Sequence, residues 1–383
     1  MKNLKIQIDG TNRLNKGAEL MLVAVLEQIE KNAPDAHVYY NATGNLGDMQ
    51  NYPGLKVKQR LSLKYSRFPS AVLNRLHISN LHFTNKKAIK GMDVILDASG
   101  FQFSDQWDYS KERLDILENY YKKLKGQGAK IILLPQALGP FETASGKRMM
   151  DIVAKYVDIL VAREKISYDY ALKAGVPQDK LWLNTDFTLL VKATAPQKYE
   201  YLKNGVCIIP NKKMVTHTSA KSNEYLNLLK GSISFLLEKG EKPFLLNHEG
   251  VGDLALCDEV NSAFDNKLDL ITDLNAKEVK GIIGQSLLTI SSRFHGVASA
   301  LNQGVPCLAT SWNHKYEMLF KDFGLGDMIL NIAGSQENTD LKISKALEER
   351  ETIAKRLKEN KKELSQSIEK MWVGIWKFIY ADK

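Results

Sequence analysis

Residues 287–315 read LLTISSRFHGVASALNQGVPCLATSWNHK, and this stretch decides the fold. The apolar run at 287–291 predicts a buried strand, the spacing of apolar residues over 296–302 predicts a helix, and the apolar run at 306–310 predicts a second strand. Two strands that are joined through a helix lie parallel in one sheet. The stretch therefore predicts a parallel sheet that is covered by helices.

The same alternation continues on both sides of this stretch. Strand patterns alternate with helical spacing from residue 4 to residue 174, and the alternation begins again at residue 206. Between them, KATAPQKYEYLK at 192–203 fits neither pattern and is typical of a linker. We therefore expect an α/β protein with two Rossmann-like doubly wound domains, 1–192 and 204–338, that face each other across a cleft. Residues 339–383 predict a helical tail that packs back on a domain.

The composition is typical of a globular protein. Of the 383 residues, 44% are hydrophobic and 25% are charged, which suffices for two buried cores. No apolar run reaches the roughly 20 residues that cross a bilayer, and MKNLKIQIDG lacks the apolar core of a signal peptide. We therefore expect a cytoplasmic protein. The three cysteines are far apart in the sequence and are expected to be reduced and buried.

Residues 56–90 form a basic segment, with nine lysines and arginines and no acidic residue. One interpretation is a solvated, irregular segment. The other is a docking surface for a lipid-linked or phosphorylated acceptor, which implies peripheral contact with the anionic inner face of a membrane. No nucleic-acid motif accompanies the charge, so nucleic acid is not an expected partner.

The candidate site follows the strand predicted at 287–291. Arg293 and His295 occupy the turn between this strand and the next helix. A helix N-terminus and a guanidinium both attract carboxylates and phosphates, and an imidazole exchanges a proton near neutral pH. An alternative is structural: Arg293 would be an interdomain salt-bridge partner and His295 a capping or core histidine.

The stretch SSRFHGVASALNQGVPCLATSWNHKYEMLFKDFGL resembles the C-terminal signature of the polysaccharide pyruvyltransferase family. GTNRLNKGAELMLVAVLEQI resembles the opening of that family, and DVILDASGFQFSD, LLPQALGPF, VDILVAREKISYDYALKAG and NTDFTLL follow in the expected order. The resemblance extends from residue 6 to about residue 325. It implies a GT-B-like pair of Rossmann-type domains, phosphoenolpyruvate as donor and co-substrate, and no other cofactor.

The resemblance also implies roles for individual residues. Arg293 and His295 match the RxH motif of the family, and Arg163 in VAREK matches the arginine that the first domain contributes. We expect the arginines to bind the donor and His295 to act as the general acid. His314 and Lys315 follow the next strand as further donor contacts, although His314 is equally suited to cap the helix after it. One departure is that Ala18 follows the glycine of the first loop, where many members carry an acidic residue.

Residues that end strands in the first domain are candidates for the acceptor. Asn12, Asn15 and Gly17 lie in a loop that would hold a sugar or phosphate, or that would simply turn tightly into a helix. Asp97 and Ser99 end a buried strand, where a carboxylate can orient or deprotonate a sugar hydroxyl or cap the loop. Weaker candidates of the same kind are Gln136 and Asp186. No residues have metal-ligand spacing, so we expect no metal.

These observations favour a pyruvyltransferase that forms a ketal on a saccharide during cell-surface polysaccharide biosynthesis. The acceptor is a saccharide, and the sequence does not decide whether a lipid carries it. A first alternative is a GT-B glycosyltransferase that uses a nucleotide sugar, with Glu317 as the residue that binds the ribose. A second alternative is a carbohydrate-binding protein without catalytic activity.

Overall fold

The computed structural model describes residues 4–40, 57–59, 91–216, 222–310 and 315–381. Contacts divide the chain into two compact units. Unit 1 comprises 1–13, 25–185 and 372–383, and unit 2 comprises 14–24 and 186–371. The boundary between the two units thus falls at residue 186, before the linker that the sequence predicts. The start of the first helix belongs to unit 2 and its remainder to unit 1, whereas the end of the C-terminal tail belongs to unit 1 and its beginning to unit 2.

Unit 1 contains a parallel sheet in which seven strands are described, in the order β3-β2-β1-β4-β5-β6-β7. The strands between β1 and β6 are buried along most of their length, because a sheet covered on both faces has no solvated side. The connection reverses direction between β1 and β4, which is the switch point of a doubly wound sheet. The strands are β1 (Lys5–Asp9), β2 (His37–Tyr40), β3 (Val57–Gln59), β4 (Val94–Asp97), β5 (Lys130–Gln136), β6 (Ile159–Ala162) and β7 (Leu181–Leu183).

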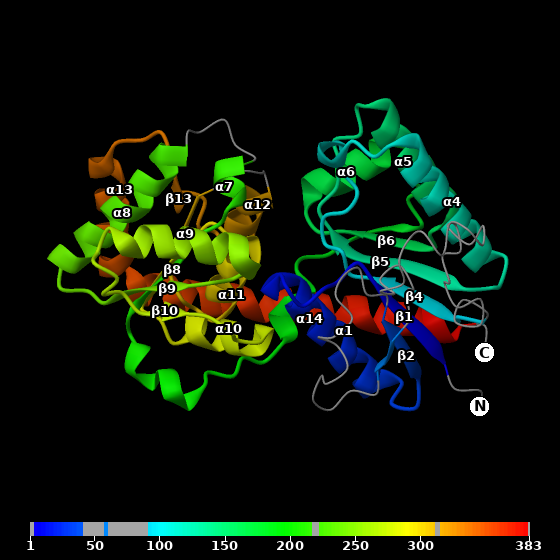
Figure 1. Cartoon of the computed structure of the whole chain (residues 1–383). Helices are drawn as coiled ribbons and strands as arrows, with labels where there is room; N and C mark the ends of the chain where they lie inside the picture. Colours follow the sequence, from blue (N-terminus) through cyan, green and yellow to red (C-terminus); the bar gives the residue numbers. More distant parts are fainter. Residues whose placement is uncertain (1–3, 41–56, 60–90, 217–221, 311–314, 382–383) are drawn as a thin grey trace, which may run out of the picture. The chain divides into compact units, whose positions relative to one another are not determined.

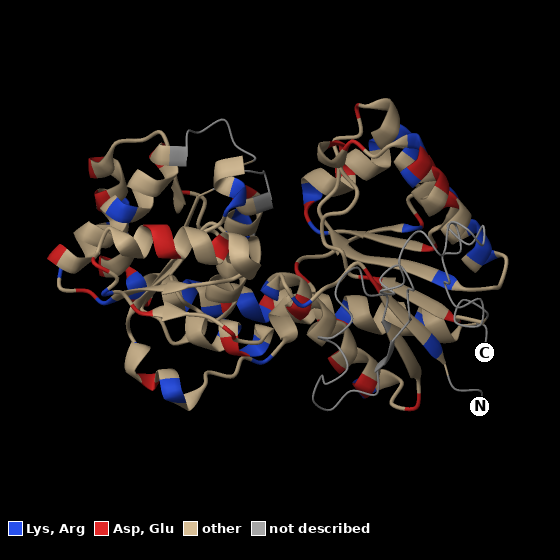
Figure 2. Cartoon of the chain, viewed as in Figure 1, with Lys and Arg blue, Asp and Glu red and all other residues tan. Residues whose placement is uncertain are grey.

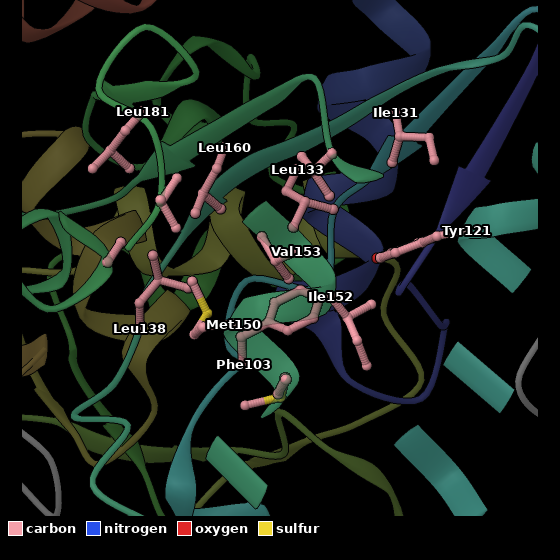
Figure 3. Packing of buried hydrophobic residues seen from close by; sticks show 14 of the residues in the cluster. Phe103, Tyr121, Ile131, Leu133, Leu138, Met150, Ile152, Val153, Leu160 and Leu181 are labelled. Carbon is pink, nitrogen blue, oxygen red and sulfur yellow. The ribbon is translucent and has the colours of Figure 1, made fainter. Parts of the chain in front are cut away.

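Helices cover both faces of this sheet (Figure 1). They are α1 (Lys16–Asn32), η3 (Asp105–Trp107), α4 (Lys111–Lys125), α5 (Ala144–Tyr156) and α6 (Lys165–Lys173). In the core, Leu133 and Leu160 of the sheet point toward Met150 and Val153 of α5, beside Phe103 (Figure 3). These side chains are almost completely buried, and their burial is the main force that holds α5 on the sheet.

Unit 2 repeats the plan with a parallel sheet in the order β10-β9-β8-β11-β12-β13. Its switch point lies between β8 and β11, the two central strands, which pair from residue 206 with 288 to residue 209 with 291. The strands are β8 (Val206–Ile209), β9 (Pro243–Leu246), β10 (Leu270–Ile271), β11 (Leu288–Ser291), β12 (Cys307–Thr310) and β13 (Ile329–Leu330). The expected α/β class with two parallel sheets is confirmed.

The helices of unit 2 pack as two groups, with α8 against α9 and α13, and α10 against α11. They are η4 (Phe187–Leu190), η5 (Gln197–Leu202), α7 (Lys213–Thr216), α8 (Ser222–Glu238), α9 (Gly250–Ser262), α10 (Ala276–Gly284), α11 (Phe294–Asn302), α12 (Lys315–Asp322), α13 (Gln336–Glu348) and α14 (Arg350–Tyr380), whose last residues lie in unit 1. The tail predicted as one helical stretch is thus two helices, and it divides at Glu349, the C-cap of α13.

The surface carries both charge signs. Lysines and arginines alternate with aspartates and glutamates along the outer helices of each unit (Figure 2). Apart from β3, the basic segment 56–90 lies outside the described residues, so its docking role stays a prediction. Within the part of the chain that is described, no helix combines the length and the apolar character that a membrane span requires. All three cysteines are free and buried, as expected.

Candidate functional site

The candidate site lies at the carboxyl ends of the central strands of unit 2. The loops after β8, β9 and β11 carry its polar residues, at 211–213, 247–249 and 292–295. Ligands of open α/β sheets bind at this edge, next to the switch point. The first turn of α1, residues 15–19, belongs to the same unit and contributes to the site.

Buried hydrogen bonds fix the turn after β11. The Ser292 hydroxyl accepts hydrogen bonds from Tyr225 at 2.7 Å and from Thr310 at 2.6 Å. The Ser292 carbonyl accepts hydrogen bonds from the Asn211 amide at 2.7 Å and from the Tyr316 hydroxyl at 2.9 Å. These partners come from β12, α8, α12 and the loop after β8. They hold the backbone at Ser292 in place, and so they position the turn that carries Arg293 and His295.

Arg293 is the N-cap residue of α11, and it is only 6% exposed. Its two terminal nitrogens contact the carboxylates of Glu249 and Asp253. Burial lowers the pKa of Arg293 to about 10, so the guanidinium stays charged at neutral pH, and burial raises the pKa of Asp253 to about 7. Arg293 is thus a salt-bridge partner within unit 2, and its role as a donor ligand stays a prediction.

His295 lies in the first turn of α11, and its ring is held from two sides. Its Nε2 lies 3.5 Å from Oδ2 of Asp186. On the other side, the ring packs against Gly17: a Cβ at position 17 would lie 2.1 Å from Nδ1 of His295. Phe294 contacts the same ring edge to face, with the centroids 5.3 Å apart. The ring therefore has one defined position, and glycine is needed at position 17 to make room for it.

The loop that leads into α1 is a capped helix start. The Asn15 side chain accepts hydrogen bonds from the N–H groups of Gly17 and Ala18, and the Asn15 carbonyl accepts one from Glu19. The Lys16 N–H donates to the carbonyl of His248 at 3.2 Å. These N–H groups thus have partners within the chain, as at a capped helix N-terminus. The acceptor role of the loop stays a prediction.

Basic side chains lie near the turn that carries Arg293 and His295. The pKa of His248 lies well below its usual 6.5, because the side chain is buried and because Arg293, His295 and Lys16 are positive neighbours. Burial and the charge of Arg293 also lower the pKa of Lys213, against the opposing effect of Asp253. Mutual repulsion among these groups would fall if an anion bound beside them. Carboxylates offset part of this charge, because Glu19 pairs with Lys16 at 3.0 Å and both Glu249 and Asp253 contact Arg293. The binding of an anionic ligand at these loop ends stays a prediction.

The sequence analysis overlooked several residues of this site. Asn211, His248 and Glu249 lie in the turns after β8 and β9, where a search of the few residues after each predicted strand would have found them. Lys213 and Asp253 lie in the first turns of α7 and α9, beyond such a search. Asp186, considered a weak candidate, proves to be the neighbour of His295. His314 lies outside the described residues, and of Lys315 only its place as the first residue of α12 is described.

A second polar cluster lies at the switch point of unit 1. Asp97 accepts hydrogen bonds from the Ser99 N–H at 2.9 Å and from the Gln136 side chain at 3.1 Å. Burial raises the pKa of Asp97 to about 6, helped by the negative charge of the adjacent Asp9. Gly10 approaches the Ser99 backbone so closely that a Cβ at residue 10 would lie 2.7 Å from it. The candidates Asp97, Ser99 and Gln136 are thus together in one network.

Asn12 and Arg163 also belong to unit 1. Asn12 is half-buried in the loop after β1. Arg163 is buried directly after β6; its N–H donates to the carbonyl of Gln136, and its Nε contacts the Glu164 carboxylate at 3.4 Å. The acceptor role of Asn12 and the donor role of Arg163 both stay predictions.

The sequence is similar to a known protein family and to a known protein of polysaccharide biosynthesis. A family model described as polysaccharide pyruvyl transferase matches residues 15–314. This range includes the turn that carries Arg293 and His295 and the other loops of the site in unit 2. The amylovoran biosynthesis protein AmsJ of Erwinia amylovora is 21% identical over 293 residues, which are 71% of this chain and 69% of AmsJ.

Solved structures are similar in fold over almost the whole chain. Alr3699/HepE of Anabaena, in complex with UDP and glucose, has a TM-score of 0.61 at 12% identity and covers 99% of this chain and 100% of its own. The MnaA–UDP structure of S. aureus has a TM-score of 0.62 at 11% identity, with 98% and 97% covered. A UDP-GlcNAc 2-epimerase of Methanocaldococcus jannaschii has a TM-score of 0.58 at 13% identity, with 90% and 92% covered. The expected GT-B-like fold is confirmed.

Proposed function

Since the chain belongs to the polysaccharide pyruvyl transferase family, and so is a transferase that acts on polysaccharide, we propose that it moves the pyruvyl group of phosphoenolpyruvate onto a saccharide as a ketal. The observation that carries this proposal is the position of His295, held between Gly17 and Asp186 among basic side chains. A proton donor inside a positive environment is what chemistry on a phosphorylated enol acid requires.

The basic side chains would bind the donor through its phosphate and carboxylate. Lys16 and Lys213 supply positive charge from α1 and from the loop after β8. Arg293 already contacts two carboxylates, and of these Glu249 is 30% exposed whereas Asp253 is buried. We expect the donor to displace Glu249 and to keep Asp253 in place, because Glu249 is the more exposed of the two carboxylates.

The proposed reaction begins with a proton transfer and ends with the release of phosphate and the formation of the ketal. His295 gives its proton to the methylene carbon of the donor, which becomes a methyl group, and positive charge develops at C2. One hydroxyl of the saccharide attacks C2 and loses its proton. Phosphate then leaves C2, and a second hydroxyl bonds to the same carbon and also loses its proton. The proton balance closes, because one hydroxyl proton restores His295 and the other leaves with phosphate.

Asp97 is our candidate for the acceptor side. It is a buried carboxylate at the switch point of unit 1, and a pKa of about 6 suits a group that accepts a proton from a sugar hydroxyl near neutral pH. The name of AmsJ places that relative in the biosynthesis of amylovoran, which supports a role in the assembly of an exopolysaccharide.

The main alternative is a glycosyltransferase that uses a nucleotide sugar. It draws on the solved relatives that contain UDP, although at 11–12% identity they share only the fold with this chain. Thermal shift separates the two functions, because a ligand at 100 times its Kd stabilises the folded state by about 2.7 kcal/mol. Stabilisation by phosphoenolpyruvate supports our proposal, and stabilisation by UDP alone contradicts it.

The direct test is release of phosphate from phosphoenolpyruvate in the presence of a mixed extract of saccharides and sugar lipids. We expect release that depends on the extract and falls about 10²- to 10⁴-fold in His295→Gln, because a positioned proton donor contributes that much to the rate. His295→Gln should still be stabilised by phosphoenolpyruvate. Normal turnover by this variant would contradict the role of His295.

A further inference from the structure

We propose that Asp186 is the positioning residue of His295, holding the ring and fixing which imidazole nitrogen carries the proton when the ring is neutral. The proposal rests on the proposed function and deepens it. Oδ2 of Asp186 lies 3.5 Å from Nε2 of His295, within the range of an ion pair. Asp186 is buried, with only 2% of its surface exposed, so little water screens this interaction.

The backbone around Asp186 is built to hold this carboxylate in place. Asp186 is the N-cap residue of η4, and its Oδ1 accepts hydrogen bonds from the N–H of Thr188 at 2.9 Å and from the Thr188 hydroxyl at 2.7 Å. With Oδ1 engaged in this way, the carboxylate directs its second oxygen, Oδ2, toward the imidazole.

The η4 helix is itself anchored to the helices that carry the site. The buried Lys280 of α10 donates to the carbonyls of Thr188 at 2.9 Å and Val191 at 2.8 Å. The Asn302 side chain, at the end of α11, donates to the carbonyl of Leu189 at 3.0 Å. Because α11 also carries His295, the carboxylate and the imidazole are fixed to one framework, and this framework keeps their distance constant.

The two imidazole nitrogens therefore have different surroundings. Nε2 is directed to Asp186, whereas Nδ1 is the ring atom closest to the position that a Cβ of residue 17 would take. A carboxylate oxygen 3.5 Å from Nε2 favours a proton on that nitrogen, and its negative charge stabilises the protonated ring.

Charged groups on the other elements near the ring also influence the stability of protonated His295. They are Lys16 and Glu19 of α1, His248 and Glu249 after β9, and Arg293 beside the ring. Lys16 and Arg293 are positive and disfavour a second positive charge on His295, so the carboxylate of Asp186 is needed to offset them.

The test compares Asp186→Asn with the wild type in the assay of phosphate release. Asparagine retains an oxygen for the Thr188 contacts, but its uncharged amide group replaces the negative oxygen beside Nε2. We expect kcat to fall at least 10²-fold, with KM for phosphoenolpyruvate changed less than threefold. The high-pH limb of the kcat profile should move to lower pH, because loss of the carboxylate lowers the pKa of His295. Thr188→Val is the matched control, which removes one contact of Oδ1 and should cost less than tenfold.

A double variant separates positioning from a general loss of structure. In the His295→Gln background, Asp186→Asn should have no further effect on kcat if Asp186 acts through the imidazole. Equal and multiplicative losses in both backgrounds would overturn the proposal. So would an Asp186→Asn variant with the kcat and pH profile of the wild type, even when His295→Gln is inactive; full activity of His295→Gln would instead contradict the proposed function.

Imidazole ¹⁵N NMR of the wild-type protein provides a test that needs no folded Asp186 variant. His295→Gln assigns the signal of the ring by its disappearance. At a pH where the ring is neutral, we expect the proton on Nε2. A ring that carries its proton on Nδ1 would overturn the proposal.

Discussion

The contact between Gly17 and His295 leads to a sharp prediction for Gly17→Ala. The added methyl carbon would lie 2.1 Å from Nδ1 and 2.4 Å from Cγ of the His295 ring. Nonbonded heavy atoms need about 3.5 Å, so the ring must move by roughly 1 Å or more. A displacement of about 1 Å in a catalytic group costs on the order of 10² in rate, or about 2.7 kcal/mol of barrier.

The same substitution should leave the protein folded. Alanine gains up to about 1 kcal/mol over glycine in a helix, and crowding costs about 1–3 kcal/mol, so the net loss of stability is at most about 3 kcal/mol. Gly326→Ala is the matched control, because a Cβ at position 326 meets nothing within 4 Å. The assay is phosphate release, with urea unfolding measured in parallel. A folded Gly17→Ala variant that retains more than about a third of the wild-type kcat would refute the reasoning.

Three further substitutions test the electrostatics of the two units. Burial raises the pKa of Asp97 from 3.8 to about 6, so the folded state binds this proton more tightly; the free energy of unfolding should fall by about 3 kcal/mol between about pH 3 and pH 7, and Asp97→Asn should remove this slope in urea titrations. Asp253→Ala leaves the buried Arg293 with Glu249 alone and should cost about 3–5 kcal/mol of stability, whereas a loss below about 1 kcal/mol would contradict the ion pair. Lys280→Met leaves two buried carbonyls without their donor and should cost about 1–3 kcal/mol for each; thermal unfolding at unchanged Tm would rule out this anchor.

The sequence predicts the fold well because burial on both faces gives parallel strands a strong signal. The apolar runs at 287–291 and 306–310 correspond to β11 and β12 to within one residue. The strands that the sequence analysis missed, β3, β7 and β13, contain only two or three residues each. A run that short has no period that distinguishes it from a loop.

The site was harder to predict than the fold. Residues 293 and 295 were found because strand, turn and helix follow each other directly in the sequence. The roles of Asp186 and Gly17 depend on contacts with His295 that are distant in sequence, and no local pattern encodes them. The ion pairs of Arg293 were missed for the same reason, since Glu249 and Asp253 belong to a different strand and helix.

The assignment of residues 14–24 to unit 2 has a consequence for biosynthesis. The ribosome makes this segment before its partners, the His248 carbonyl and the His295 ring, which follow it by more than 200 residues in the sequence. The nascent chain must keep the start of α1 available while most of unit 1 is being made. Closure of the wall beside His295 should therefore wait until α11 has been made, and a fragment made from residue 186 onward would lack that wall.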